Sequence, residues 1–113
     1  MQEELYNKLN RNYTLDEVQG YVKKVIKLRG LENKKVEQVM LLLIEEVGEL
    51  AKAIRKENTN MKIDGKKEYN YDTVESEIAD VFIVLNSLCN LLDINLFEAL
   101  KEKESINVAR KWK

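Results

Sequence analysis

Apolar residues recur at helical spacing along most of the chain and predict four main helices. From Leu15 the apolar positions share one face until Gly30, and the preceding pattern Thr14-Leu15-Asp16-Glu17 is typical of a capping box. A stronger apolar pattern predicts a second helix from about Asn33 to about Glu57. A short helical turn is expected before both, near residues 3–9.

Two further capping patterns organise the second half of the chain. The pattern Asp72-Thr73-Val74-Glu75 predicts a third helix that runs to about Leu92. The pattern Asn95-Leu96-Phe97-Glu98 predicts a fourth helix that reaches the C-terminus. Between the second and third helices, residues 58–71 are polar and contain Gly65, so they are predicted to form a loop. We therefore expect an all-α, four-helix-bundle-like protomer in which residues 1–113 form one domain.

Carboxylates interrupt the apolar faces of the second and third helices. At about 100° per residue, Glu46 falls inside the apolar arc of the second helix, Glu49 lies at its edge and Glu45 just beyond it. In the third helix Glu77 falls inside the apolar stripe and Asp80 borders it. The two apolar sets are Val39, Leu43, Val47, Leu50 and Ile54, and the stripe Val74, Ile78, Val81, Leu85, Leu88 and Leu92, which is expected to be buried.

Carboxylates that face a core are costly and repel one another, and a divalent cation would relieve both problems. Oxygen ligands suit Mg²⁺ or Mn²⁺ better than zinc, and bound Mg²⁺ commonly keeps substrate phosphates in its shell. Two alternatives remain open. The acidic residues of the second helix could form a solvated face paired with Lys52 and Arg55, or the carboxylates could form buried ion pairs inside the bundle.

The predicted fourth helix carries basic and amide side chains on its inner arc. Lys103, Asn107 and Arg110 share this arc with apolar residues, and they could hold phosphate oxygens or neutralise the glutamates. Trp112 is interpreted as a packing anchor, with base stacking as the alternative. Residues 58–71 could cover a substrate, although a solvated loop is the simpler interpretation.

Composition narrows the possible partners. The chain has 19 basic and 20 acidic residues and a net charge of −1, so no nucleic-acid or membrane partner is expected. Histidine is absent, which excludes histidine-based catalysis and histidine-ligated metals.

The single cysteine, Cys89, is expected to be a packed thiol and suits a reducing cytoplasm. The N-terminus lacks signal-peptide features, and the longest apolar run, residues 39–44, is too short to span a bilayer.

Two acidic motifs and a basic tail together resemble a known family. The motifs are EEVGEL at residues 45–50 and ESEIAD at residues 75–80, with 27 residues between Glu49 and Glu77. The tail is KEKESINVARKW at residues 101–112. In this order they resemble the MazG-like members of the all-α nucleoside triphosphate pyrophosphohydrolase superfamily, over roughly residues 36–112.

The resemblance implies Mg²⁺-dependent hydrolysis of a nucleoside triphosphate between its α and β phosphates, with Mn²⁺ as a possible substitute. It also implies a homodimer or homotetramer. A dUTP- or dCTP-specific pyrophosphatase of the same superfamily and a non-catalytic helical oligomerisation module are the alternatives. The resemblance implies that the metal ligands are Glu46, Glu49, Glu77 and Asp80. It implies that Glu45 orients or deprotonates the attacking water. The implied phosphate contacts are Lys103, Asn107 and Arg110.

Overall fold

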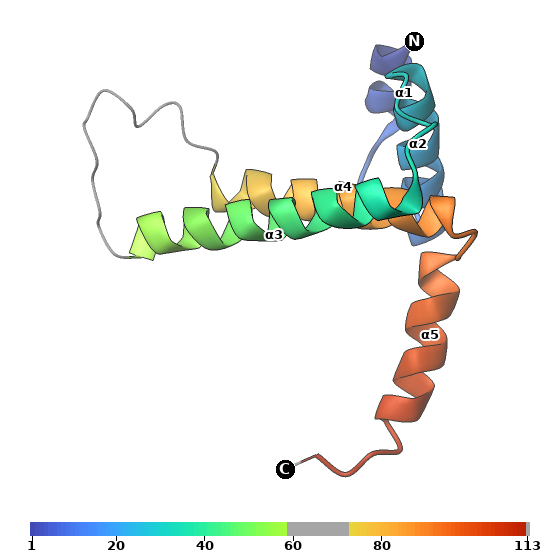
Figure 1. Cartoon of the computed structure of the whole chain (residues 1–113). Helices are drawn as coiled ribbons and strands as arrows, with labels where there is room; N and C mark the ends of the chain where they lie inside the picture. Colours follow the sequence, from blue (N-terminus) through green and yellow to red (C-terminus); the bar gives the residue numbers. More distant parts are fainter. Residues whose placement is uncertain (59–72, 113) are drawn as a thin grey trace. The chain divides into compact units, whose positions relative to one another are not determined.

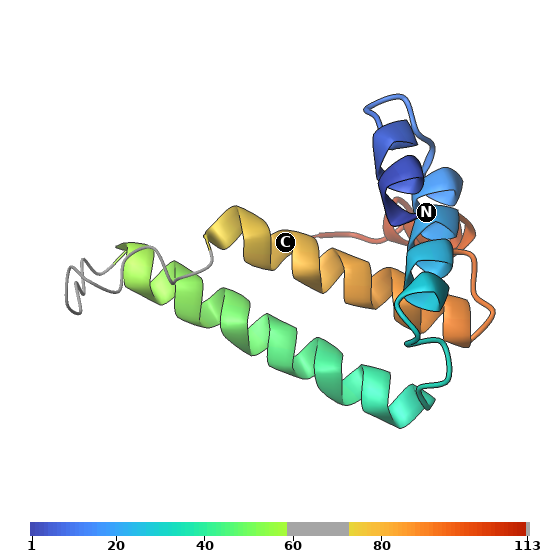
Figure 2. The same cartoon turned by 90° about the horizontal axis from the view of Figure 1, so that it is seen from above.

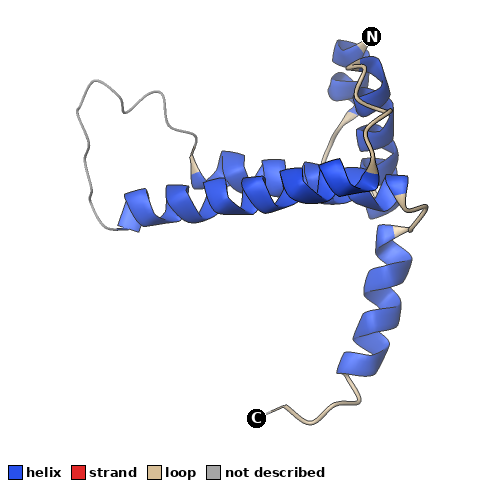
Figure 3. Cartoon of the chain, viewed as in Figure 1, coloured by secondary structure: helices blue, strands red, loops and turns tan. Residues whose placement is uncertain are grey.

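All regular structure in the part of the chain that the computed structural model describes, residues 1–58 and 73–112, is helical (Figures 1 and 3). This confirms the all-α prediction, and each predicted helix overlaps one helix of the structure, with differences at some ends. The predicted loop lies outside the described residues, apart from Asn58, which ends α3. The helices are α1 (Gln2–Lys8), α2 (Leu15–Leu28), α3 (Val36–Asn58), α4 (Val74–Leu91) and α5 (Leu96–Asn107).

No single helix among the described residues is long and apolar enough to cross a membrane. Helices α4 and α5 reach the length and apolar composition of a membrane span only when they are taken together, and this pair is bent by 97°.

Side-chain caps begin three of the helices. Thr14 and Glu17 form the predicted capping box: Thr14 Oγ1 accepts from the Glu17 amide at 3.1 Å, and Glu17 Oε1 accepts from the Thr14 amide at 2.8 Å. Asn95 Oδ1 accepts from the amide of Glu98 at 2.8 Å, as predicted for α5. The prediction for α4 was wrong by one residue, because Thr73 Oγ1 accepts from the Ser76 amide at 3.1 Å and the helix begins at Val74.

Helix α2 ends as predicted, whereas α5 ends before the C-terminus. At the end of α2 Gly30 adopts a φ of +74°, and the amide of Leu31 donates to the carbonyl of Ile26 at 3.0 Å. Helix α5 ends at Asn107, whose carbonyl accepts from Trp112 Nε1 at 3.0 Å and from the amide of Arg110 at 3.2 Å. Both bonds satisfy a terminal carbonyl that a continued helix would otherwise satisfy.

The chain divides into two compact units. Unit 1 comprises residues 1–34 and 86–113, with α1, α2, the end of α4 and α5, while unit 2 comprises residues 35–85. In unit 1, α2 packs against both α1 and α5. The apolar residues buried in this unit are Val22, Val25 and Cys89, which confirms the prediction of a packed thiol.

A buried glutamine joins three points of unit 1. The side chain of Gln19, 8% exposed, donates from Nε2 to Asn90 Oδ1 at 3.0 Å and to the Ile94 carbonyl at 2.7 Å. Its Oε1 accepts from the amide of Leu96 at 2.9 Å. Asn90 Nδ2 in turn donates to the carbonyl of Gln19 at 3.2 Å. The end of α4, the connection after it and the start of α5 are therefore all bonded to one residue of α2.

Unit 2 contains α3 and the first part of α4, which run antiparallel and side by side (Figures 1 and 2). Val39 is buried in this unit, but much of its apolar surface is not. The prediction that the whole apolar stripe of α4 is buried was wrong, because Ile78 is 53% exposed and Leu92, in unit 1, is 45% exposed. Apart from Leu41, which is 63% exposed, the exposed large apolar residues of unit 2 are called here the apolar face: Val36, Met40, Ile44, Val47 and Ile54 of α3 with Ile78 and Phe82 of α4.

Candidate metal centre

Three carboxylates from two helices meet in unit 2. Glu46 of α3 and Glu77 and Asp80 of α4 each offer an oxygen atom, and these atoms all lie within 4.8 Å of one another. The spacing of three residues places Glu77 and Asp80 on neighbouring turns of one helix face. Glu46 approaches them because α3 lies alongside this part of α4 (Figure 2). The fold thus brings together three of the four ligands that the sequence predicts.

The cluster is partly shielded from solvent. Glu77 is only 3% exposed, which agrees with its predicted place inside the apolar stripe of α4. Glu46 and Asp80 are half-buried. A carboxylate loses hydration on burial, and neighbouring carboxylates add repulsion between like charges. The arrangement therefore favours a bound cation.

The donor set fits a hard divalent cation. Mg²⁺ binds oxygen at about 2.0–2.1 Å, so two ligands on opposite sides of the ion lie about 4.2 Å apart. Three oxygen atoms within 4.8 Å of one another can therefore contact one ion after small side-chain rotations. The cluster contains no nitrogen or sulfur ligand, as expected for Mg²⁺ or Mn²⁺ rather than zinc.

Glu45 and Glu49 lie beside this cluster in sequence but outside it in space. Both side chains are exposed on α3, and neither belongs to the group of oxygen atoms within 4.8 Å. Glu49 is one helical turn after Glu46, so a longer reach or a second ion would be needed to include it. Its role as a ligand and the role of Glu45 toward water both stay predictions.

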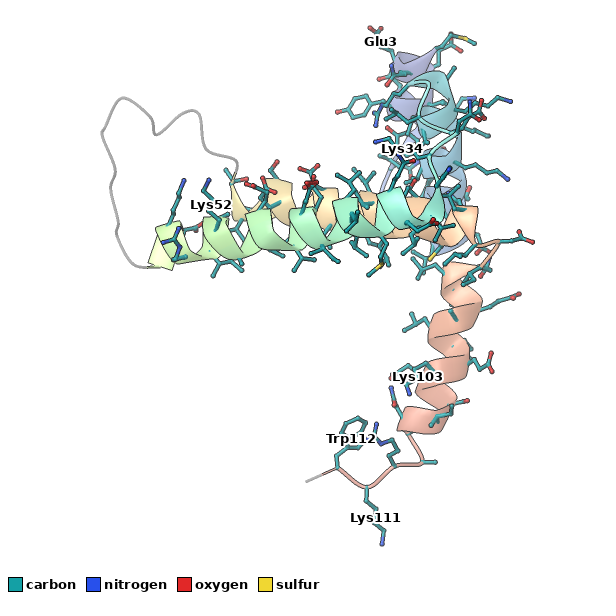
Figure 4. All side chains as sticks on the ribbon, in the orientation of Figure 1. Glu3, Lys34, Lys52, Lys103, Lys111 and Trp112 are labelled. Atoms are coloured by element: carbon teal, nitrogen blue, oxygen red, sulfur yellow. The ribbon has the colours of Figure 1, made fainter. Side chains whose placement is uncertain are left out.

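The two edges of the α3–α4 pair differ in chemistry (Figure 4). Side chains that end in oxygen gather along one edge, where Lys52 also lies, and side chains that end in carbon line the other. On α3, Val36, Val47 and Ile54 of the apolar face fall within about 20° of one another at 100° per residue. The pair is therefore amphipathic, with the carboxylates and the apolar face directed differently.

The predicted phosphate-contacting residues belong to unit 1. Lys103 is exposed on α5, and Asn107 is the last residue of that helix. Arg110 lies beyond the helix end, so the prediction that it shares a helical arc with Lys103 and Asn107 was wrong. One hydrogen of the Asn107 amide group is already used, because Nδ2 donates to Glu104 Oε2 at 2.6 Å.

Arg110 and Trp112 contact each other at the end of the chain. The guanidinium of Arg110 lies over the Trp112 ring, 4.3 Å from its centroid, and the tryptophan is 65% exposed (Figure 4). The interpretation of Trp112 as a packing anchor holds only locally, since the ring packs on Arg110 and on the end of α5 and not in a core.

Cys89 takes no part in the carboxylate cluster. It is 8% exposed, and burial raises the pKa of its thiol. A thiol with a raised pKa is less often present as the thiolate that binds metals or attacks electrophiles. Its role in unit 1 is packing.

One of the comparisons with known proteins identifies a family. The family model described as the MazG nucleotide pyrophosphohydrolase domain matches residues 34–105. The chain belongs to the MazG family. No curated protein and no solved structure matches it.

The MazG match places the carboxylate cluster within the family domain. Residues 34–105 include all five acidic candidates and Lys103, whereas Asn107 and Arg110 follow the matched range. MazG membership supports nucleotide pyrophosphohydrolase activity as the general chemistry of the chain. It also suits a metal-dependent reaction, because the three clustered carboxylates lie inside the MazG domain.

Proposed function

We propose that this MazG protein hydrolyses nucleoside triphosphates to a nucleoside monophosphate and pyrophosphate and requires Mg²⁺, which Mn²⁺ can replace. The observation that carries this proposal is the cluster of Glu46, Glu77 and Asp80, with oxygen atoms within 4.8 Å of one another inside the matched domain. Carboxylates alone repel a triphosphate, so a cation between them and the substrate gives the cluster a function.

The bond changes follow from the products. The oxygen of a water molecule adds to the α phosphorus, the bond from that phosphorus to the α–β bridging oxygen breaks, and pyrophosphate leaves with that oxygen. Glu45, exposed beside Glu46, accepts the proton that the water loses and returns it to solvent. Glu46, Glu77 and Asp80 would hold the metal, and Glu49 would join them as a fourth ligand through a longer reach or a second ion. When bound, Mg²⁺ supplies positive charge that neutralises the triphosphate.

The basic and amide side chains of unit 1 bind the phosphates. Lys103 offers an exposed ammonium group, and Asn107 retains one free amide hydrogen after its bond to Glu104. The guanidinium of Arg110, stacked on Trp112, has N–H groups at its edge that can bind phosphate oxygens in pairs. Together they stabilise the charge that develops on the leaving pyrophosphate.

A pyrophosphate-release assay tests the reaction. The purified chain is incubated with each ribo- and deoxynucleoside triphosphate in the presence of Mg²⁺, Mn²⁺ or EDTA, and both products are quantified. We expect equal amounts of monophosphate and pyrophosphate with either metal and none with EDTA. Release of single phosphates, or of nothing from folded protein, would contradict the proposal.

The pyrophosphate-release assay, together with a measurement of Mn²⁺ binding, distinguishes this proposal from two other functions. A dUTP- or dCTP-specific pyrophosphatase would turn over only one base and would have the same metal requirement. A non-catalytic helical module, in which the glutamates pair with Lys103 and Arg110, would neither release pyrophosphate nor bind Mn²⁺. The clustering of three carboxylates favours the enzyme, because an ion-pair module has no need to gather like charges.

We also propose that the chain functions as a cytoplasmic homodimer or homotetramer through its apolar face. The seven apolar side chains of this face are between 36% and 57% exposed in the single chain. Exposed apolar surface of this kind is typical of an interaction site. Sedimentation should show an oligomer for the wild-type chain and for Lys24→Glu, a charge reversal on exposed α2, but a smaller species for Ile44→Glu. A wild-type monomer would contradict this assembly.

A further inference from the structure

We propose that Gln19 is a positioning residue, which sets the direction of α5 and thereby the places of Lys103 and Asn107. This inference rests on the proposed function of those two side chains as phosphate contacts. Gln19 is outside the residues matched by the family model and far from the acidic motifs in sequence. Its hydrogen bonds in unit 1 carry the argument.

Apolar packing does not fix α5 along its length. None of its 12 residues is buried, and the side chain of Lys103 is exposed. A helix of this length is marginal in water without support from other parts of the fold. Its support comes from the contact with α2 and from the hydrogen bonds where its chain begins.

Gln19 holds that beginning at three points with a single side chain. Its amide group donates to Asn90 in the last turn of α4 and to the carbonyl of Ile94 in the connection, at 3.0 and 2.7 Å. Its carbonyl oxygen accepts from the amide of Leu96, the first residue of α5, at 2.9 Å. A neutral amide buried with three hydrogen bonds is well satisfied, and its geometry is therefore well defined.

A second residue of α2 supports the start of α5 through an exposed hydrogen bond. Asn95, the N-cap of α5, donates from Nδ2 to Asp16 Oδ1 at 2.8 Å, while its own Oδ1 caps the helix. Asp16 precedes Gln19 by three residues, so both lie on one side of α2. This outer bond is exposed and weaker, and the buried Gln19 bonds set the direction.

A small change in the direction of α5 at its start becomes a large displacement at its far end. Asn107 lies 11 residues after Leu96, which is roughly 16 Å along a helix at 1.5 Å per residue. A rotation of about 10° at Leu96 would move Asn107 by roughly 3 Å. Misplacement of a substrate-positioning group by about 1 Å can cost about 100-fold in rate.

The test compares Gln19→Leu, which keeps a side chain of similar volume and removes its three bonds, with Val22→Ala. Val22 is on the same helix and only 1% exposed, so its truncation lowers stability without removing any of the three Gln19 hydrogen bonds. For a nucleoside triphosphate that the wild type hydrolyses, we expect Gln19→Leu to raise KM at least about tenfold. We expect Val22→Ala to leave KM unchanged for the folded protein. Mn²⁺ affinity measured without nucleotide should be unchanged in both variants.

A double-mutant cycle separates positioning from general stability. If Gln19 acts through Lys103, the effect of Gln19→Leu on kcat/KM should be much smaller when Lys103 is already alanine. Equal effects in both backgrounds, or an unchanged KM in Gln19→Leu, would overturn the inference. If Gln19→Leu does not fold, Asn90→Ala replaces it in the cycle. It removes one of the three side-chain bonds of Gln19, together with the Asn90 Nδ2 bond to the Gln19 carbonyl, and should raise KM less.

The failure of this inference is distinct from the failure of the proposed function. A wild-type chain that hydrolyses no nucleotide overturns the proposed function and the role of Gln19 together. A wild-type chain that turns over its substrate, combined with additive effects in the cycle, overturns only the positioning role.

Discussion

Gln19 in unit 1 and Glu77 in unit 2 are both polar side chains on apolar helix faces, and both are less than a tenth exposed. Gln19 is neutral, and hydrogen bonds to Asn90, Ile94 and Leu96 account for its burial. Glu77 is a carboxylate whose buried side chain lies against Glu46 and Asp80. A buried neutral amide with three hydrogen bonds needs no ligand, whereas a buried carboxylate beside two half-buried ones favours a nearby cation.

This contrast predicts that substitutions in the two units have different consequences. Substitutions at the carboxylates should change metal binding and turnover with little loss of stability. Substitutions in the core of unit 1 should lower stability and leave metal binding intact.

Loss of a carboxylate ligand should have the largest effect. Loss of a group that only supports a metal ligand costs about 10–100-fold, so removing a ligand should cost at least about 100-fold. We expect Glu46→Gln and Asp80→Asn to lower kcat/KM by this factor or more and to keep the helical circular dichroism of the wild type. Glu37→Gln, an exposed change on α3, serves as the control and should retain activity. Wild-type turnover in Glu46→Gln or Asp80→Asn would remove that residue from the ligand set.

Truncation of the core of unit 1 should come next. Val22→Ala removes two methyl groups from a side chain that is 1% exposed, and we expect it to lower the free energy of unfolding by about 2 kcal/mol. Val108→Ala, at a position that is 81% exposed, should change it by less than about 0.5 kcal/mol. Urea denaturation of both variants measures the difference. Equal stability of the two variants would show that Val22 is not part of a packed core.

Metal should stabilise the wild-type chain by a smaller amount. At ten times the dissociation constant, Mg²⁺ binding to the folded state adds about 1.4 kcal/mol, which raises the Tm of a chain of this size by about 4–6 °C. We expect this shift in differential scanning calorimetry of the wild type, and its loss in Glu77→Gln. An identical shift in Glu77→Gln would place the cation elsewhere.

The cap of α2 should give the smallest effect. Thr14→Ala removes the hydroxyl that accepts from the Glu17 amide, and loss of an N-cap typically costs about 1 kcal/mol. Thermal unfolding should detect this loss, and Thr14→Ser should restore most of it because serine keeps the hydroxyl. A serine variant as unstable as the alanine variant would argue that the methyl group of Thr14 matters more than its cap.

Much of the helical layout could be predicted because its signals are local. Thr14 and Asn95 begin their helices with side chains that bond to amides three residues later, and Gly30 ends α2 with a positive φ. The burial of Glu77 followed from its place in the apolar stripe of α4. Each of these features depends on residues within a few positions of one another, so the sequence pattern was sufficient.

The rest depends on contacts that sequence spacing does not encode. Gln19 and Asn90 are 71 residues apart, and nothing near either residue specifies their bond. The one available signal was the position of Gln19 among the apolar residues of α2, an anomaly like that of Glu46 and Glu77. The exposure of Ile78 was missed because an apolar stripe does not reveal whether its own chain covers it.

The end of α5 was also missed, because it involves a side chain five residues further along the chain that the apolar pattern does not include. The predicted helical arc continued to Arg110, but the helix ends at Asn107, whose carbonyl accepts from the Trp112 ring and from the Arg110 amide. The same local structure stacks Arg110 on Trp112. A side chain at the end of the chain thus changed the geometry of two predicted phosphate contacts.

The most direct test of the account is a Mn²⁺ titration of the nucleotide-free chain, followed by electron paramagnetic resonance. The wild type and Glu37→Gln should bind Mn²⁺ with equal affinity, and Glu77→Gln and Asp80→Asn should bind it far more weakly. That result would identify the cluster of Glu46, Glu77 and Asp80 as the metal centre. Equal binding by all four proteins, or no binding by the folded wild type, would contradict it.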